Sequence, residues 1–386
     1  MFSTKAGNWN YPTTVRFGVG RITEIPEAAG AVGMSHPLLV TDPDVAKLPF
    51  TTEILDLHAK AGVPVTLYTG VRKNPVGGNV SEGVAAYRDA GCDGVIALGG
   101  GSPLDVGKTI ALMVGQRRPL WDFEDRADWW TRVDPAGVAP IVAVPTTSGT
   151  GSEVGRASVI INPEEKRKVL IFHPKMLPQV VIADPALTAG LPPFLTAATG
   201  MDALSHSLEA YCAPGLHPLA DGIALEGMRL VHTSLEQAVA DGADLDARAR
   251  MMAASTMGAT AFQKGLGAMH ALAHPIGAVA DTHHGLTNAV VMPYVLRFNR
   301  AAIEGRIERL ARYLGIDGGF DGFVDWVLEL RQRIGIAHTL ADIGVSESLV
   351  DSLAPMVVED PSAGTNPIGL DVRSAADLLR TCIRGA

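Results

Sequence analysis

The feature that most constrains the fold is an alternation, across the first half of the chain, of short apolar runs with segments of helical spacing. Five runs are typical of buried strands, because they are short, apolar and bounded by glycine or proline. They span residues 37–42, 63–70, 94–101, 140–147 and 179–185. Alanine-rich segments with helical spacing lie between several of them, as at 51–61 and 80–90. Alternating strands and helices predict a parallel sheet covered by helices on both faces.

The pattern changes after about residue 190, where alanine, leucine, methionine and glutamate dominate and β-branched runs become rare. Pro192 and Pro193 stand where a helix begins or a linker bends. We therefore expect an α/β N-terminal domain with a Rossmann-like parallel sheet over residues 1–188. An all-α C-terminal domain should follow over residues 189–386, with the joint near 186–194.

Charge and composition exclude several classes of function. A composition of 47% hydrophobic and 19% charged residues is typical of a packed globular protein. The formal net charge of −9 argues against a nucleic-acid binder, which usually has an excess of basic residues. The densest basic run, residues 166–168, is too short to follow a phosphate backbone. No run of about 18 apolar residues predicts a membrane span, and the N-terminus lacks the apolar stretch of a signal peptide. We therefore expect neither a nucleic acid nor a membrane as a partner.

The cysteines indicate a reducing compartment. They number three, are widely separated and form no CxxC pair, which argues against disulfides and against a zinc–thiolate site. We expect a cytoplasmic protein whose thiols are small core residues. The cysteines are Cys92, Cys212 and Cys382.

A glycine-rich stretch, GGGSPLDVGK at 99–108, follows a predicted strand and opens a predicted helix. Ser102, with Pro103 and Asp105 behind it, matches a capping box, and a helix N-terminus favours a phosphate group. The stretch fits neither GxGxxG nor Walker A, so an ordinary strand-to-helix turn explains it equally well. The candidate phosphate-binding residues are Gly99, Gly100, Gly101 and Ser102.

Two further strand ends carry candidate cofactor ligands. PTTSGTGSE at 145–153 offers the hydroxyls of Thr146, Thr147 and Thr150, although a polar surface loop is an equal alternative. Asp42 could accept hydrogen bonds from a ribose and repel a 2′-phosphate, but spacing alone favours a turn aspartate. Ligands gather at the carboxyl ends of parallel strands, so two such loops favour a binding site.

Histidines cluster in the second half. In each of two pairs, the two members are of metal-ligating types and stand four residues apart, so both project from one helix face. One carboxylate with three imidazoles suits divalent iron, zinc, cobalt or manganese and leaves room for a substrate oxygen. Spacing alone leaves five or six candidate ligands. They are Asp202 with His206, His270 with His274, and His284 with its ambiguous neighbour His283.

These stretches together resemble the iron-containing (group III) alcohol dehydrogenase family, which shares its fold with dehydroquinate synthases. The resemblance covers nearly the whole chain. It is carried by GGGSPLDVGK, PTTSGTGSE, GMDALSHSLEAY, HALAHPIGA and HHGLTNAVVMP, in the family's order and spacing.

The resemblance assigns roles that spacing left open. It implies that Asp202, His206, His270 and His284 bind the metal, whereas His274 lies near the nicotinamide and the substrate. It implies a dinucleotide site lined by both loops and Asp42, and it adds Asn74 and Lys168 to that site. KNPV at 73–76 departs from the family's more usual NPT, so Val76 receives no role. Asp42 implies a preference for NAD over NADP.

The implied activity is hydride transfer between a small alcohol or diol and NAD, with the reverse reaction reducing an aldehyde. A Lewis-acid metal would lower the pKa of the alcohol; Fe²⁺ is expected, with Zn²⁺ as the alternative. A homodimer is also expected. Rival interpretations are a hydroxyacid–oxoacid transhydrogenase of the same fold and a metallohydrolase, which would leave both loops unexplained. The aromatic and acidic stretch 121–135 favours a surface flap over a border of the cleft.

Overall fold

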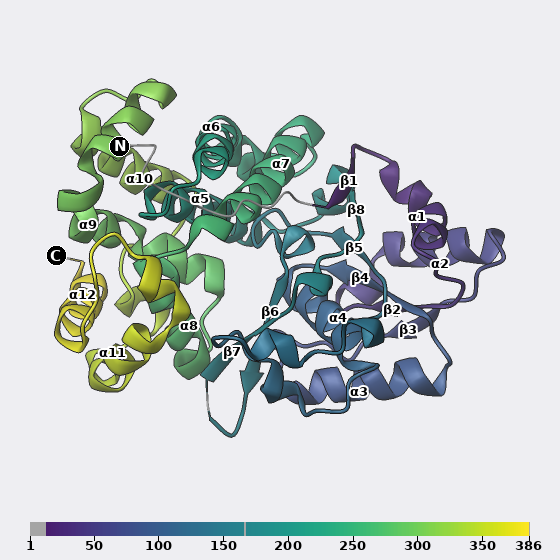
Figure 1. The fold of residues 1–386 in the computed structure, drawn as a ribbon. Coiled ribbons are helices and arrows are strands. Elements are labelled where there is room, and N and C mark those ends of the chain that lie inside the picture. Colours follow the sequence, from purple (N-terminus) through teal and green to yellow (C-terminus); the bar gives the residue numbers. More distant parts are fainter. Residues whose placement is uncertain (1–12, 166, 386) are drawn as a thin grey trace. The chain divides into compact units, whose positions relative to one another are not determined.

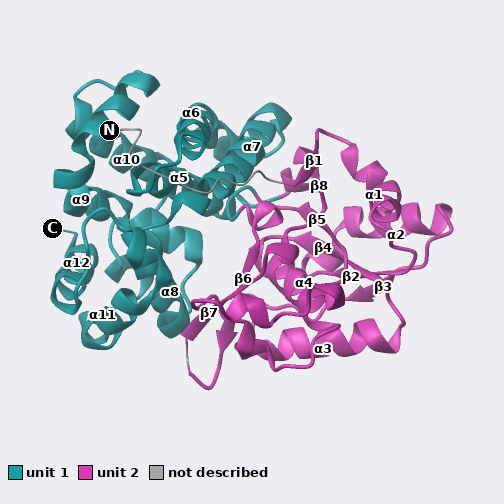
Figure 2. Cartoon of the chain, viewed as in Figure 1, with its two compact units in different colours: residues 1–11, 148–150, 191–386 teal, residues 12–147, 151–190 magenta. Residues whose placement is uncertain are grey.

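The computed structural model of the protein describes residues 13–165 and 167–385. The start of the expected N-terminal domain, residues 1–12, and Lys166 of the short basic run lie outside the described residues. The chain divides into two compact units (Figure 2). The α/β unit runs up to Thr147 and resumes over Gly151–Gly190, and the helical unit contains Ser148–Thr150 and everything from Leu191 onward.

A six-stranded, wholly parallel sheet forms the centre of the α/β unit (Figure 1). Its order is β1-β8-β5-β4-β2-β3. All five predicted runs are strands of this sheet, and the edge strand β1 was not predicted. The strands are β1 (Thr14–Phe17), β2 (Pro37–Val40), β3 (Thr66–Tyr68), β4 (Gly94–Gly99), β5 (Ile141–Pro145) and β8 (Val180–Ala183).

Helices cover both faces of this sheet, as predicted. Successive strand residues point to opposite faces, so Leu38 joins one apolar core and Leu39 the other. Helices α3 (Gly77–Asp89) and α4 (Gly101–Met113) pack on the first face. Helices α1 (Ile25–Ala31) and α2 (Pro49–Lys60) pack on the second. Burial on both faces explains why the strand sequences are continuously apolar rather than alternating.

An antiparallel hairpin, absent from the predicted elements, follows the second polar loop. It consists of β6 (Ala157–Asn162) and β7 (Arg167–Phe172), and the inward side chains of β6 alternate with partly exposed ones. The 121–135 stretch is anchored beside it, because Phe123 is fully buried in the core and Glu124 forms a bidentate ion pair with Arg167 at 2.8 Å. The expectation of a surface flap was therefore wrong for this part of the stretch.

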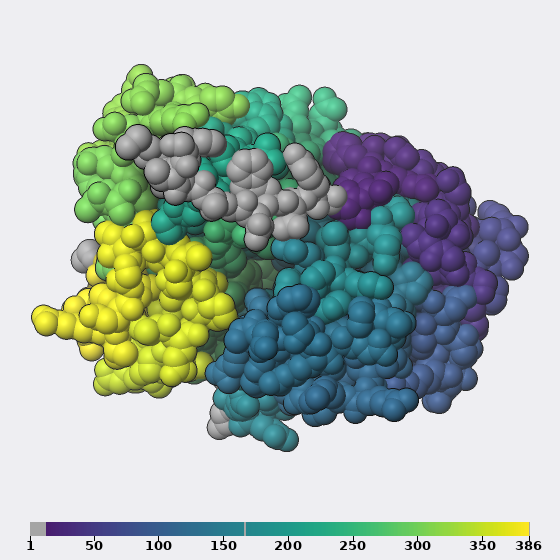
Figure 3. Space-filling model, viewed as in Figure 1, coloured from purple at the N-terminus to yellow at the C-terminus, as the bar shows by residue number. Residues whose placement is uncertain are grey.

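Eight α-helices dominate the described part of the helical unit beyond Leu191. Helix α5 is buried along nearly its whole length and packs against α6, α7 and α9. Helices α11 and α12 pack together and form one continuous region of the visible surface (yellow in Figure 3). The helices are α5 (Pro193–Cys212), α6 (Pro218–Ala240), α7 (Leu245–Ala261), α8 (Ala268–Ala280), α9 (His284–Leu314), α10 (Gly319–Arg333), α11 (Val350–Glu359) and α12 (Val372–Arg384).

Proline and glycine place the ends of the helices that matter for the site. Pro193 occupies the first turn of α5, where its missing N–H has no partner to lose. Gly315 ends α9 in the left-handed conformation, with φ of 73°. Within the described residues, none of these helices combines the length and the apolar character that a bilayer crossing needs.

Candidate active site

Three helices of the helical unit bring four of the candidate ligands together. Asp202 and His206 lie one turn apart on α5, His270 lies in the first turn of α8, and His284 begins α9. One ligand atom from each lies within 4.8 Å of all the others. The structure therefore groups the four residues that the family resemblance selected from the wider set of candidates.

The distances within this group suit a metal ion. The Oδ1 atom of Asp202 lies 3.6 Å from Nε2 of His284 and 4.0 Å from Nε2 of His270. Metal–nitrogen and metal–oxygen bonds of about 2.0–2.2 Å place two ligands of one ion up to roughly 4.4 Å apart, so these two pairs fit and an ion would draw the whole group, which spans up to 4.8 Å, together by a few tenths of an ångström. Three imidazoles and a carboxylate also form the mixed nitrogen and oxygen donor set that divalent iron and zinc accept. The residues present fit a divalent metal.

His206 is held in the neutral form that ligates metals. Its Nδ1 atom lies 3.2 Å from the carbonyl oxygen of Gly149. Burial lowers the pKa of this imidazole to about 4, although the nearby Asp202 carboxylate opposes the shift. Gly149 must be glycine for this contact, because a Cβ there would lie 2.6 Å from Cβ of Thr199.

Glu209 of α5 is a site residue that the sequence analysis missed. Its carboxylate accepts hydrogen bonds of 2.6 Å from the backbone N–H of Met269 and from Nδ1 of His270. Burial lowers the pKa of His270, but the carboxylates of Glu209 and Asp202 outweigh burial and raise it overall. The spacing held a signal, since Glu209 follows His206 by three residues on one helix face.

The amide of Asn288 was also missed. Its Nδ2 atom donates to Oδ1 of Asp202 at 2.9 Å and lies 3.2 Å from Nε2 of both His270 and His284. Asn288 follows His284 by four residues on α9, so helical spacing could have identified it. The amide holds the Asp202 carboxylate in place among the imidazoles.

His274 lies beside the four candidate ligands but outside their group. Its ring stacks on that of His284, with centroids 5.3 Å apart. Its Nδ1 atom donates to the carboxylate of Asp360, which is 10% exposed, at 2.8 Å. Burial would raise the pKa of Asp360, but His274 and the backbone N–H of Ser362 together lower it below its usual range. Nothing in the spacing linked Asp360 to His274, because 86 residues separate them.

The residue after His284 must be glycine for a steric reason. A Cβ on Gly285 would lie 2.4 Å from the carbonyl oxygen of Ala198 in α5. Only glycine lets the start of α9 approach α5 closely enough to bring His284 to Asp202. The ambiguous His283 caps this helix, and its Nδ1 accepts from the backbone N–H of Leu286.

In the α/β unit, the two predicted loops meet at the carboxyl ends of neighbouring strands. The backbone N–H of Thr146, after β5, donates to the carbonyl oxygen of Gly99 at the end of β4. Thr147 lies against Gly100, where a Cβ would be 3.2 Å from its methyl group. This edge of a parallel sheet is where dinucleotides bind in related architectures.

The predicted capping box at Ser102 was wrong. Helix α4 begins at Gly101, with Gly100 as its N-cap, so Ser102 lies inside the first turn. The carboxylate of Asp105 accepts instead from the hydroxyl of Ser152 at 2.6 Å and from the backbone N–H of Val159 at 2.9 Å. Asp105 therefore joins α4 to the end of the second loop and to β6, a contact that no local pattern reveals.

The remaining cofactor candidates lie in separate segments of the chain. Asp42 follows β2, and its Oδ1 atom accepts from the backbone N–H groups of Asp44 and Val45, as a turn aspartate does. Asn74 adopts the left-handed conformation, with φ of 48°. Thr150 falls in the short segment Ser148–Thr150 of the helical unit, whereas the other cofactor candidates lie in the α/β unit.

The Asn74 segment and Lys168 share a neighbour. The backbone N–H of Ile161 on β6 donates to the carbonyl oxygen of Pro75 at 2.8 Å. Ile161 also pairs with Lys168 across the hairpin. The structure thus places the segment that contains Asn74 beside the hairpin that carries Lys168.

Comparison with known proteins agrees with this architecture. Residues 12–185 match the sequence profile of iron-containing alcohol dehydrogenase, and residues 196–383 match that of the C-terminal region of the Fe-containing alcohol dehydrogenase family. A 4-hydroxybutyrate dehydrogenase of Cupriavidus necator is 40% identical over 96% of this chain and 97% of its own length. A 1,3-propanediol dehydrogenase of Klebsiella pneumoniae is 37% identical over 95% of each chain.

Solved structures show the same two-part fold. The crystal structure of a 1,3-propanediol oxidoreductase superposes with a TM-score of 0.93 at 36% identity, covering 98% of this chain and all of the other. An iron-containing alcohol dehydrogenase of Thermotoga maritima gives a TM-score of 0.84 at 26% identity, with 98% and 100% of the two chains covered. With both profiles matched across nearly its whole length, the chain belongs to the iron-containing alcohol dehydrogenase family and is a metal-dependent alcohol dehydrogenase.

Proposed function

We propose that Asp202, His206, His270 and His284 bind one divalent metal ion, with Fe²⁺ as the physiological ion and Zn²⁺ as the alternative. The observation that carries this proposal is the convergence of four ligand atoms, from three helices, within 4.8 Å of one another. A buried carboxylate on His270 and a backbone carbonyl on His206 supply the outer partners that orient metal-binding imidazoles.

The dinucleotide in this proposal is NAD, used in preference to NADP. Its phosphates would lie at Gly99, Gly100, Gly101 and Ser102, where the start of α4 presents backbone N–H groups. The hydroxyls of Thr146, Thr147 and Thr150 would hold the sugar and phosphate groups, with Asn74 and Lys168 as further contacts. The Asp42 carboxylate would accept from the adenosine ribose. In functional terms, residues 1–188 would then bind the dinucleotide and residues 189–386 the metal and substrate.

Together the metal would supply a Lewis acid that lowers the pKa of an alcohol, and NAD would accept the hydride. The residues of the chain position the reactants. Asp360 accepts from His274, which fixes the ring with Nε2 pointing away from that carboxylate. His274 in this orientation can hydrogen-bond the substrate and relay its proton. The neighbouring histidines, and not His274, would bind the metal.

The proposed substrate is a small primary alcohol with a second polar group at its far end. This is supported by the names of two relatives, one acting on 4-hydroxybutyrate and one on 1,3-propanediol. The reverse reaction would reduce the corresponding aldehyde. We further propose that the enzyme is a cytoplasmic homodimer, and light scattering after size exclusion would test the dimer.

An absorbance assay at 340 nm tests the proposed function. Protein stripped of metal and reloaded with Fe²⁺ or Zn²⁺ should reduce NAD with 4-hydroxybutyrate, 1,3-propanediol or a simple primary alcohol, and the stripped protein should not. Activity that survives complete metal removal would contradict the metal site. If added NAD gave no signal while a hydroxyacid and an oxoacid exchanged hydride, the transhydrogenase would replace this proposal.

A further inference from the structure

The first turn of α8 receives its hydrogen-bond acceptors from distant parts of the helical unit. The first N–H groups of a helix have no partner within the helix. The N-cap, Gly267, has no side chain to supply one. The N–H of Ala268 donates to Oδ1 of Asn366 at 3.0 Å, and the N–H of Met269 donates to Oε1 of Glu209 at 2.6 Å. Two side chains therefore share the capping of the helix that carries His270.

Glu209 differs from Asn366 because it also binds a candidate metal ligand. Its Oε2 atom lies 2.6 Å from Nδ1 of His270. A carboxylate accepts hydrogen bonds and does not donate them, so the hydrogen of this contact resides on Nδ1 of His270. The lone pair of that imidazole is then on Nε2, the atom that lies 4.0 Å from Oδ1 of Asp202.

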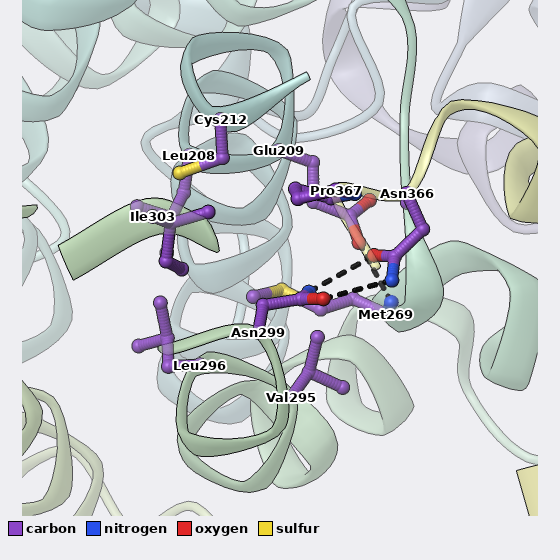
Figure 4. Close-up of a pocket in the computed structure, with 11 residues that line it drawn as sticks. Leu208, Glu209, Cys212, Met269, Val295, Leu296, Asn299, Ile303, Asn366 and Pro367 are labelled. Carbon is purple, nitrogen blue, oxygen red and sulfur yellow. Dashed lines mark hydrogen bonds between the residues drawn. The ribbon is translucent and has the colours of Figure 1, made fainter. Parts of the chain in front are cut away.

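Glu209 is enclosed by protein. Its side chain is 5% exposed. The cavity beside it measures about 10 Å³, at the lower limit of what one water molecule needs. Asn299 and Asn366 also line this cavity and exchange amide hydrogen bonds of 2.9 and 2.8 Å (Figure 4). The carboxylate therefore depends on Met269 and His270 for its hydrogen bonds.

We infer that Glu209 is a positioning residue of the metal centre, which ties the tautomer and orientation of His270 to the start of α8. The inference rests on the proposed metal-binding role of His270. Through one carboxylate, the place where α8 begins and the direction of the Nε2 lone pair are fixed together. Outer partners of this kind typically contribute about 10- to 100-fold to metal affinity.

Glu209→Gln isolates this role, because an amide has one acceptor oxygen and one donor nitrogen. If the oxygen accepts from His270, two donors face each other at Met269. If the oxygen accepts from Met269, the amide nitrogen donates to Nδ1 of His270, and the hydrogen of the ring moves to Nε2. Either arrangement should weaken metal binding while preserving the volume of the side chain.

The experiment measures Zn²⁺ affinity of the full-length protein by competition with a chromophoric chelator, and the visible spectrum of the Co²⁺-loaded protein. Asn366→Ala is the matched control, because it removes the other acceptor from the first turn of α8. We expect Glu209→Gln to lower Zn²⁺ affinity by about 10- to 100-fold and to shift the Co²⁺ bands. Asn366→Ala should lower thermal stability but change affinity by less than about threefold.

Two results would overturn the inference. The first is a Zn²⁺ affinity of Glu209→Gln within threefold of the parent. The second is an equal loss of Zn²⁺ affinity in Glu209→Gln and Asn366→Ala, which would make Glu209 a helix cap only. If Glu209→Gln does not fold, Glu209→Asp replaces it, and the same two results apply. His270→Ala separates this inference from the proposed function. Metal retained by His270→Ala would refute the site itself, whereas metal lost there but kept by Glu209→Gln would refute only the positioning role.

Discussion

Two histidines one turn apart on α8 have different partners. His270 is almost fully buried, and Glu209 and Asn288 contact its two ring nitrogens. His274 is partly exposed, with 18% of its side chain accessible, and bonds Asp360. His270 offers a ligand atom within 4.8 Å of the other three, which suits a metal, whereas His274 lies outside that group and is oriented by a carboxylate, which suits contact with a substrate.

Replacing each of these histidines with alanine should separate the two roles. His270→Ala should lose bound metal and activity together, because it removes a ligand atom. His274→Ala should retain metal while turnover falls by about 10²- to 10⁴-fold, the usual contribution of a positioned proton-transfer group. Metal content by mass spectrometry and kcat by absorbance would be measured on both. Metal lost from His274→Ala would contradict its separation from the ligands.

Asp42 combines two functions that can be tested separately. Its Oδ1 atom holds the turn after β2 by accepting from Asp44 and Val45. Its charge would repel the 2′-phosphate of NADP. Asn retains an acceptor oxygen and removes the charge, whereas Gly removes both.

We therefore expect Asp42→Asn to shift the ratio of kcat/KM for NADP over NAD roughly tenfold toward NADP, equivalent to about 1.4 kcal/mol. Asp42→Gly should shift the ratio in the same direction and also lower thermal stability, since the turn loses its acceptor. Kinetics with both dinucleotides would measure the ratio. A ratio unchanged in both variants would remove Asp42 from the specificity site.

At the scale of elements, the centre depends on how closely the start of α9 approaches α5. Gly285 is buried against the backbone of Ala198, and backbone atoms cannot rotate aside as a side chain can. The same helix contains Gly305, which is exposed and has nothing within 4 Å of its missing Cβ. Gly285 in the first turn is therefore packed against another helix, whereas Gly305 in the interior of the helix faces open space.

Gly285→Ala should destabilise the protein by about 1–3 kcal/mol, as overpacking usually does, and should weaken metal binding by displacing His284. Gly305→Ala should instead stabilise it by up to about 1 kcal/mol, because alanine is the better helix former. Chemical denaturation and Zn²⁺ competition would be compared for the two variants. Equal effects would show that the contact with Ala198 does not constrain α9.

In the molecule as a whole, the proposed metal ion and the proposed NAD would contact mainly different compact units. All four proposed metal ligands lie in the helical unit, which has its own apolar core. Most of the proposed NAD contacts lie in the α/β unit, which has separate cores on the two faces of its sheet. A ligand stabilises the structure that binds it and not the unfolded chain.

Hydrogen exchange should therefore respond to each ligand in a different unit. Removing the metal with a chelator should speed exchange in α5, α8 and the start of α9, and leave β4 and the start of α4 little changed. Adding NAD to the metal-free protein should slow exchange around β4, β5 and α4. Mass spectrometry of peptic peptides would map both effects. If the metal alone slowed hydrogen exchange in the glycine-rich loop, the proposal that metal and NAD bind mainly to different units would be contradicted.

Local patterns were sufficient for much of the fold. The five apolar runs became strands of one parallel sheet because burial on both faces demands continuous apolar sequence. Strand β1 was missed because its four residues, TVRF, are partly exposed and carry a charge. The β6–β7 hairpin was missed because it departs from the strand–helix alternation on which the expectation rested.

The order of residues alone was enough to show which residue types could bind a metal and which pairs share a helix face, because i,i+4 spacing is a property of the helix. The family resemblance then selected four of them, and the structure groups the same four. The residues that surround these four became visible only in the packed helices. Glu209 and Asp360 meet residues 61 and 86 positions away, and such contacts depend on how helices pack, which no local spacing encodes.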